Sequence, residues 1–293
     1  MLVVYSFTGV AGSFVGPMAF TLVADHFPYE QRPNAISWII VGMSGAYLIG
    51  APIIGYISGF AGWRGSFLWF VLPVSLLGLL LAIRFLPSGK NPSTGINAGG
   101  LMQSFKAVLT NGSAVSCLIG TTLISASYMS VVSYAPSYFR ERFSVPTSYA
   151  SFLIMGACVF FIFGSRICGR FIIRFGRKNM IFWNAALAAL FIFAFFNVSN
   201  IWVSMGVRFI CGTFVSIVFT STNALTLEQV PEFRGTVMSL SQATFSLGGV
   251  LGTGLGGLIV LLSGYSALGV SHGGMMFVAM LILYFFAKEP NTT

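Results

Sequence analysis

The stretch GRFIIRFGRK, residues 169–178, places four cations within ten positions. It interrupts long apolar runs in a chain of 293 residues that has only 15 Lys+Arg and 6 Asp+Glu. Hydrophobic residues make up 56% of the chain and charged residues 7%, whereas a soluble domain carries about 25% charged residues. Because a chain of this composition cannot cover itself with a water-facing surface, we expect most of it to lie in lipid.

Nine apolar runs reach or approach the roughly 20 residues that a helix needs to cross the hydrocarbon of a bilayer. They lie at residues 2–24, 35–57, 66–85, 114–139, 149–172, 180–196, 201–225, 237–262 and 267–287. The runs are continuous, whereas the strands of a membrane barrel alternate. The sequence therefore predicts an all-α integral membrane protein with about nine transmembrane helices.

The cations between these runs predict an orientation. Alternate gaps and the tail carry eleven cations on one side of the membrane and four on the other. The positive-inside rule then places the first side, with residues 169–178 and the C-terminus, in the cytoplasm. The net charge of +9 is accordingly interpreted as loop charge of a multi-pass protein in the plasma membrane, not as a nucleic-acid surface. Nine spans would leave Met1 outside without a charged segment to hold it there, so we expect that helices preceding this chain are missing.

An internal repeat is visible in the sequence. Gly9 precedes Pro28 by nineteen residues, as Gly212 precedes Pro231. Other pairs at matching offsets are Asp25 with Glu228, Arg32 with Arg234, Ser37 with Ser239, Gly50 with Gly252, and Gly55 with Gly257. Repeats of this kind are typical of transporters built from two related helix bundles.

Three motifs resemble those of the major facilitator superfamily. The stretch 169–178 is similar to the family's loop signature, with Ile173 where the family usually has an aspartate. GAPIIGYISGFAGWRGSF, residues 50–67, resembles the motif of the fifth helix and the turn into the sixth, and RFICG, residues 208–212, resembles the start of a fourth or tenth helix. The resemblance runs from the family's fourth helix to its twelfth, so the first three helices would be absent. It implies a partial N-terminal bundle of three helices (1–86), a cytoplasmic inter-bundle loop (87–113) and a C-terminal six-helix bundle (114–293).

The resemblance is nearest to the drug and small-solute efflux branch of proton antiporters. It implies a secondary active transporter that moves a small, amphipathic or neutral solute by alternating access, with the bilayer, the solute and protons as partners. The alternative is a truncated remnant that transports nothing. An enzyme is disfavoured because the chain has two histidines, no paired carboxylates within a span and no nucleophile motif. No cofactor or metal is expected, since the four cysteines match no metal motif.

Polar side chains on helix faces are the candidates for binding the solute; the alternative is that these hydroxyls and amides bond their own backbone or a neighbouring helix. They are Thr121, Ser125, Tyr128, Thr213, Ser216, Thr220, Asn223 and Gln242. Arg208, inside a span, has two open interpretations: a functional cation, or a side chain that reaches out to the membrane surface. No Asp or Glu lies in the middle of a predicted span.

The cytoplasmic charges are candidates for a gate between the bundles, or else serve topology alone. The signature supplies Gly169, Arg170, Arg174, Gly176, Arg177 and Lys178, and the repeat supplies Asp25, Arg32, Glu228 and Arg234. We expect Asp25, Glu30, Glu228 and Glu232 to pair with Arg170, Arg174 and Arg177.

Small residues are candidates for close helix packing, since glycine lets helix backbones approach in a membrane. The positions are Gly50, Pro52, Gly55, Gly252 and Gly256, where Pro52 is also a candidate hinge.

Overall fold

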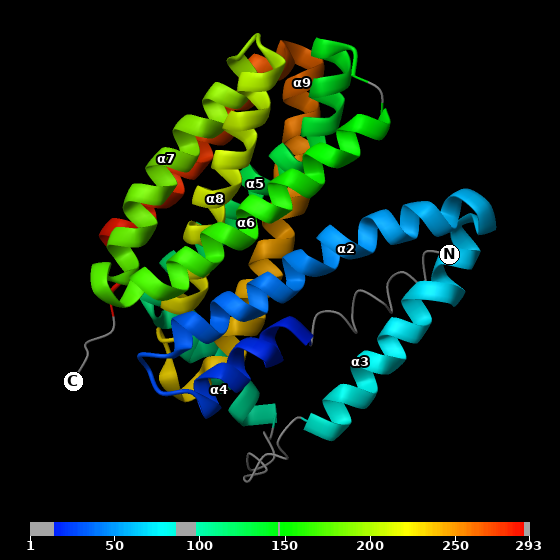
Figure 1. Cartoon of the computed structure of the whole chain (residues 1–293). Coiled ribbons are helices and arrows are strands. Elements are labelled where there is room, and N and C mark those ends of the chain that lie inside the picture. Colours follow the sequence, from blue (N-terminus) through cyan, green and yellow to red (C-terminus); the bar gives the residue numbers. More distant parts are fainter. Residues whose placement is uncertain (1–14, 86–97, 146, 290–293) are drawn as a thin grey trace.

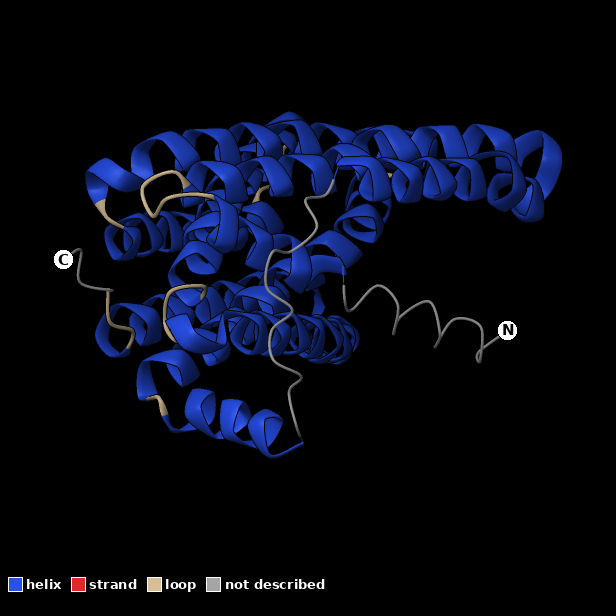
Figure 2. Ribbon diagram, turned by 90° about the horizontal axis from the view of Figure 1, so that it is seen from below, coloured by secondary structure: helices blue, strands red, loops and turns tan. Residues whose placement is uncertain are grey.

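The structure is a computed structural model that describes residues 15–85, 98–145 and 147–289. These residues form helices joined by short loops, and they include no strand (Figure 2). The prediction of an all-α protein is confirmed. The first predicted span begins in residues 1–14, which lie outside the described residues, as do parts of the predicted inter-bundle loop.

A helical segment at residues 15–26 precedes the labelled elements (Figure 1). The elements are α2 (Arg32–Ser66), the π-helical turn η1 (Phe67–Val71), α3 (Leu72–Phe85), α4 (Ala98–Thr110), α5 (Gly112–Phe143), α6 (Thr147–Phe175), α7 (Arg177–Asn197), α8 (Ile201–Thr226), the 3₁₀ turn η2 (Pro231–Phe233) and α9 (Arg234–Phe286).

The prediction of nine separate spans is wrong, because the described residues contain seven helices that are long and apolar enough to cross a membrane. The last of them covers two predicted spans, 237–262 and 267–287, in one helical element. That element reverses at Gly264, whose φ of 77° is a backbone conformation that side chains with a Cβ rarely adopt. His272 Nε2 lies 3.2 Å from the carbonyl oxygen of Gly252, so the two arms of α9 run side by side. The apolar pattern of the sequence does not predict that the turn at Gly264 is so short that helical geometry continues on both sides of it.

A second reversal occurs inside α2. Gly62 has a φ of 68°, and beyond it Ser66 Oγ donates a hydrogen bond of 3.2 Å to the carbonyl of Ile54. The first arm of α2 starts against α6 and diverges from the rest of the molecule toward this turn, and α3 leaves the turn at a wide angle to α2 (Figure 1). No residue of α3 is buried. This hairpin therefore has little protein around it, unlike α5–α9.

Glycines bring the helices of the C-terminal bundle into backbone contact. A Cβ added at Gly252 would overlap the backbone of Ala126 on α5, and one at Gly256 would overlap Ser130 Oγ. Gly50 differs, because a Cβ there would meet only Phe70, at 3.8 Å. Pro52 is exposed within α2, and the surroundings of Gly55 lie outside what the structure describes. The close packing expected of both sets of small residues is thus present on α9 and slight on α2.

The tryptophans lie on the outer surface. The chain has five, and each exposes more than half of its side chain; the least exposed, Trp63, is 51% accessible. Indole rings at such positions suit a surface that meets lipid and its interface.

Candidate functional site

A cavity of about 270 Å³ lies where α2 faces the C-terminal bundle. Its walls come from α2, α5, α6, α8 and α9, so it lies between the two parts that the repeat relates. The lining residues are Ile40, Met43, Ser44, Tyr47, Ile124, Tyr128, Met129, Val132, Ala135, Pro136, Phe139, Ala157, Cys158, Phe161, Arg208, Val215, Phe219, Gln242 and Phe245. Most are apolar or aromatic, which is typical of small-molecule sites.

Four aromatic rings form a row along the cavity wall. Tyr128 stacks on Phe161 with ring centroids 5.6 Å apart. Phe161 lies 6.5 Å from Phe219, and Phe219 lies 5.3 Å from Phe245. The row joins α5, α6, α8 and α9 and offers a continuous surface to an apolar or aromatic solute.

Arg208 lies at the start of this row. Its side chain is 5% exposed, and its guanidinium carbon is 5.8 Å from the centroid of the Tyr128 ring. Of the two interpretations that the sequence left open, the structure favours a functional one, because the buried guanidinium lines the cavity instead of reaching the membrane surface. The signal in the sequence was an ionisable residue several positions inside an apolar run.

Of the eight side chains predicted to bind solute, Tyr128 and Gln242 line the cavity and the other six do not. The six donate hydrogen bonds to backbone carbonyls: Thr121 to Cys117, Ser125 to Phe245, Thr213 to Phe160, Ser216 to Phe161, Thr220 to Ser216, and Asn223 to Phe219. They follow the alternative that the sequence allowed, in which polar groups inside a membrane bundle satisfy the backbone or join helices. Gln242 makes no side-chain hydrogen bond within the described chain, which leaves its amide available to a ligand.

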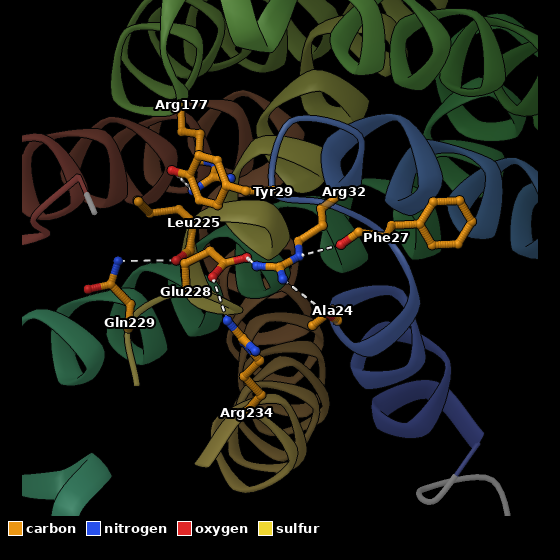
Figure 3. Close-up of polar contacts among 9 residues, drawn as sticks. All are labelled: Ala24, Phe27, Tyr29, Arg32, Arg177, Leu225, Glu228, Gln229 and Arg234. Carbon is orange, nitrogen blue, oxygen red and sulfur yellow. Dashed lines mark hydrogen bonds and ion pairs between the residues drawn. The ribbon is translucent and has the colours of Figure 1, made fainter. Parts of the chain in front are cut away.

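A cluster of three charges joins α2 to the α8–α9 connection (Figure 3). Arg32 Nη1 lies 2.6 Å from Glu228 Oε1, and Arg234 Nη2 lies 3.2 Å from Glu228 Oε2. The Glu228 side chain is only 5% exposed. Arg32 also donates to the carbonyls of Ala24 and Phe27, at 2.9 and 3.0 Å. Most of the donors of Arg32 are therefore occupied, and the position of its guanidinium is fixed.

The predicted partners of Glu228 are wrong, because its carboxylate binds Arg32 and Arg234 and no arginine of the stretch 169–178. Arg177 instead donates from Nη1 to the Tyr29 hydroxyl, at 2.7 Å, with its guanidinium 4.3 Å from the centroid of that ring. The other expected participants, which are exposed and form no ion pair in the described structure, are Asp25, Glu30, Arg170, Arg174 and Glu232. Sequence spacing located the charged face but not the pairs on it.

The remaining signature residues contact neighbouring elements. Gly169 lies against Ser37 of α2, where an added Cβ would come within 2.6 Å of Ser37 Oγ. Gly176, with a φ of 80°, starts α7, and Glu289 accepts a 2.7 Å hydrogen bond from the backbone N–H of Arg177 there. Lys178 Nζ lies 5.3 Å from the centroid of the Tyr284 ring. The sequence did not single out Tyr29 or Glu289, since neither belongs to a motif.

A further contact joins α2 to α6 beside Gly169. Arg166 Nη1 donates to Asn34 Oδ1 at 3.0 Å and to Ser37 Oγ at 2.8 Å, and its guanidinium lies 4.0 Å from the centroid of the Trp38 ring. This contact and the Glu228 cluster involve the same end of α2. Within the described residues, no group of three His, Cys, Asp or Glu side chains could hold a metal ion.

A family model described as Major Facilitator Superfamily matches this chain over residues 1–196 and 148–293. A proline/betaine transporter of Salmonella typhimurium is 26% identical over 211 residues, which is 65% of this chain and 42% of the relative. Multidrug resistance protein MdtG of Proteus mirabilis is 23% identical over 298 residues, 99% of this chain and 73% of the relative. The chain thus spans less than half of the first relative and about three quarters of the second.

Solved structures share the fold. The human organic anion transporter MFSD10 matches with a TM-score of 0.77 at 15% identity, over 91% of this chain and 67% of that one. The fucose:proton symporter FucP of E. coli matches with a TM-score of 0.74 at 14% identity, over 94% of this chain and 73% of that one.

Proposed function

The chain belongs to the major facilitator superfamily, and from this premise we propose that it moves a small amphipathic solute across the plasma membrane by alternating access. The family model and the multidrug resistance relative support a multi-pass membrane transporter in preference to an enzyme. The observation that carries the proposal is the aromatic cavity between α2 and the C-terminal bundle. Of the residues first considered for solute binding, we propose Tyr128 and Gln242, because both line that cavity.

The Glu228 cluster is the proposed gate. Its Arg32–Glu228 pair links α2 to the C-terminal bundle, and the contacts of Arg166 with Asn34 and Ser37 lie at the same end of α2. Rocking of one bundle against the other would have to break these contacts and form others. The divergence of α2 from the bundle toward Gly62 supports a state that is closed at the Arg32 end (Figure 1).

Efflux coupled to protons is the proposed direction and energy source, by resemblance. The multidrug resistance protein supports a drug-like solute, and the fucose:proton symporter, which shares the fold, supports coupling to protons. The proline/betaine transporter supports a small polar solute instead. Direction and coupling therefore need a flux measurement that varies the gradient.

We propose that the Arg32 end and the C-terminus face the cytoplasm. Asn179 is exposed at the start of α7, near this end. After replacement of the four native cysteines, the variant Asn179→Cys should react with a membrane-impermeant maleimide only in inside-out vesicles. Reaction in intact cells would show that the orientation is opposite to the one proposed.

The transport proposal is tested with the purified chain in liposomes. The probes are a radiolabelled phenylalkyl carboxylate, its amide and its amine, each measured with an imposed pH gradient and without one. A cross-linked variant carries Asn34→Cys and Arg166→Cys, and a short thiol-reactive linker joins the two new cysteines. The native side chains at these positions are 3.0 Å apart, between α2 and α6. We expect flux of at least one probe, loss of that flux on linking, and recovery when the linker is cleaved.

Two results would contradict the proposal. Absence of flux for all three probes, with the pH gradient and without it, is what a non-transporting remnant predicts. Flux that persists unchanged in the linked protein would exclude rocking about this contact.

A further inference from the structure

Arg208 is the only charged residue among those that line the cavity in the described structure. Arg208 is only 5% exposed, and its Nη1 has no hydrogen-bond partner among the described residues. A guanidinium keeps its charge at any pH that a protein experiences, so it cannot escape the cost of burial by losing a proton. A buried cation of this kind needs an anion nearby.

No Asp or Glu side chain of the described residues supplies such an anion. The chain has six Asp+Glu, and all of them fall within the described residues. Glu228 is taken by Arg32 and Arg234, and the other five are exposed: Asp25, Glu30, Glu141, Glu232 and Glu289. The titratable groups that interact with Arg208 are the Tyr128 phenol and the thiols of Cys158 and Cys211, which carry no charge at neutral pH.

The surroundings of Arg208 fit a ligand with one polar end. The aromatic row begins at Tyr128, next to the guanidinium, and continues through Phe161 and Phe219 to Phe245. Gln242, with its unpaired amide, is also part of the lining. One cation therefore lies at the start of an apolar surface that extends across four helices, in a volume suited to a small molecule.

We propose that the cavity binds a small amphipathic organic anion, with its carboxylate or sulfonate on Arg208 and its apolar body along the row from Tyr128 to Phe245. This inference rests on the proposed function for its biological meaning, and it replaces a neutral cargo with an anionic one. A planar guanidinium matches the two oxygens of a carboxylate, and such charge-assisted bonds are strong away from water. The anion would give Nη1 the partner that it lacks among the described residues.

The test is a binding comparison with the purified full chain in detergent micelles. The probes are 4-phenylbutyrate, 4-phenylbutanamide and 4-phenylbutylamine, which share one apolar body and differ in charge; affinity is measured by isothermal titration calorimetry. The unmodified chain should bind the carboxylate tighter than the amide by about tenfold or more, as a charge-assisted bond predicts. The amine should bind weakest. A phenylalkyl sulfonate extends the comparison to the second class of headgroup.

Variants assign the preference to one residue. Arg208→Gln should remove the preference for the carboxylate while amide binding persists, and Arg208→Lys should retain part of it. Arg142→Gln is the matched control, because Arg142 is exposed and contacts Ser199 outside the cavity. The melting temperature of each variant shows whether it is folded.

Equal affinity of the unmodified chain for the carboxylate and the amide would overturn the inference, whatever the variants do. So would a preference that survives in folded Arg208→Gln, or absence of binding by all probes. A preference without any flux in liposomes would leave the inference standing and remove the transport proposal. Flux of all three probes at equal rates, with equal affinities, would leave the transport proposal standing and overturn the inference.

Discussion

Two arginine sites in this molecule differ in how their positive charge is compensated. At the end of α2, Arg32 and Arg234 share the carboxylate of Glu228 and link the α8–α9 connection to α2. In the cavity, Arg208 is buried with a free Nη1 and no carboxylate beside it. Both arginines of the first site share a carboxylate of the described chain, and only Arg234 Nε is left without a hydrogen-bond partner there. The guanidinium of the second site has no carboxylate partner among the described residues.

The repeat makes this contrast sharper. Arg32 and Arg234 occupy matching positions of the two repeat copies, yet both bind the acid of the second copy, while Asp25 of the first copy is exposed. A duplicated pattern has thus become a single asymmetric cluster. Removing one partner of a buried ion pair is strongly destabilising, and a buried charge without a partner has a desolvation cost that an oppositely charged ligand can offset.

Replacement of the shared acid should have the largest effect on stability. Glu228→Gln removes the charge that compensates two arginines, and we expect the free energy of unfolding to fall by about 3 kcal/mol, near the lower bound for breaking a fully buried pair. Equilibrium unfolding in detergent micelles measures this change. Glu232→Gln is the control, since Glu232 is exposed and unpaired in the described structure and should leave stability unchanged.

The two arginines of the cluster should differ in their contributions. Arg32→Gln loses a 2.6 Å ion pair and bonds to two carbonyls, and we expect a loss of about 2 kcal/mol. Arg234, with a 3.2 Å contact and a side chain 23% exposed, should cost about 1 kcal/mol when replaced by Gln. The same unfolding assay compares them. Equal losses would mean that the link between the bundles adds nothing to the pair.

The cavity arginine should respond with the opposite sign. Arg208→Met replaces an uncompensated buried cation with an apolar side chain of similar length, so we expect the free energy of unfolding to rise by about 1 kcal/mol in the absence of ligand. Unfolding is measured in micelles without added organic anions. A loss as large as that of Arg32→Gln would reveal a partner for Arg208 and break the contrast between the two sites.

The smallest effect is expected at the repeat counterpart of Glu228. Asp25→Asn should change stability by less than about 0.5 kcal/mol, because an exposed side chain without an ion pair contributes little. A larger loss would show that Asp25 takes part in the cluster in a second conformation, and that the symmetry of the repeat is retained in function.

The sequence was sufficient for the fold class and the family because both depend on long-range regularities. Continuous apolar runs require helices in lipid, and the order of three motifs carried the resemblance. The number of spans was less secure, since residues 237–287 form one helical element that reverses at Gly264. A run length limits how many helices fit, but the backbone dihedrals of one glycine decide where a helix ends.

The site was predicted only in part because a polar stripe does not define a helix's rotation. Thr220 and Ser216 lie on one face of α8 at a step of four, but both hydroxyls bond to backbone carbonyls. The aromatic row was not predicted, since Phe161 and Phe219 resemble any buried apolar residues in a chain with 30 phenylalanines. Long-range pairing such as that of Arg32 with Glu228, 196 residues apart, depends on how the bundles dock.

The outward position of the tryptophans has a spectroscopic consequence. All five indoles are on the surface, and the described lining of the cavity contains none of them. Intrinsic emission should therefore be quenched strongly by lipids with brominated acyl chains, yet change little when a molecule enters the cavity. The emission of Trp38 should behave differently, because its ring lies under the guanidinium of Arg166 at the contact between α2 and α6. A spectral shift from that single fluorophore would register the separation of the two helices.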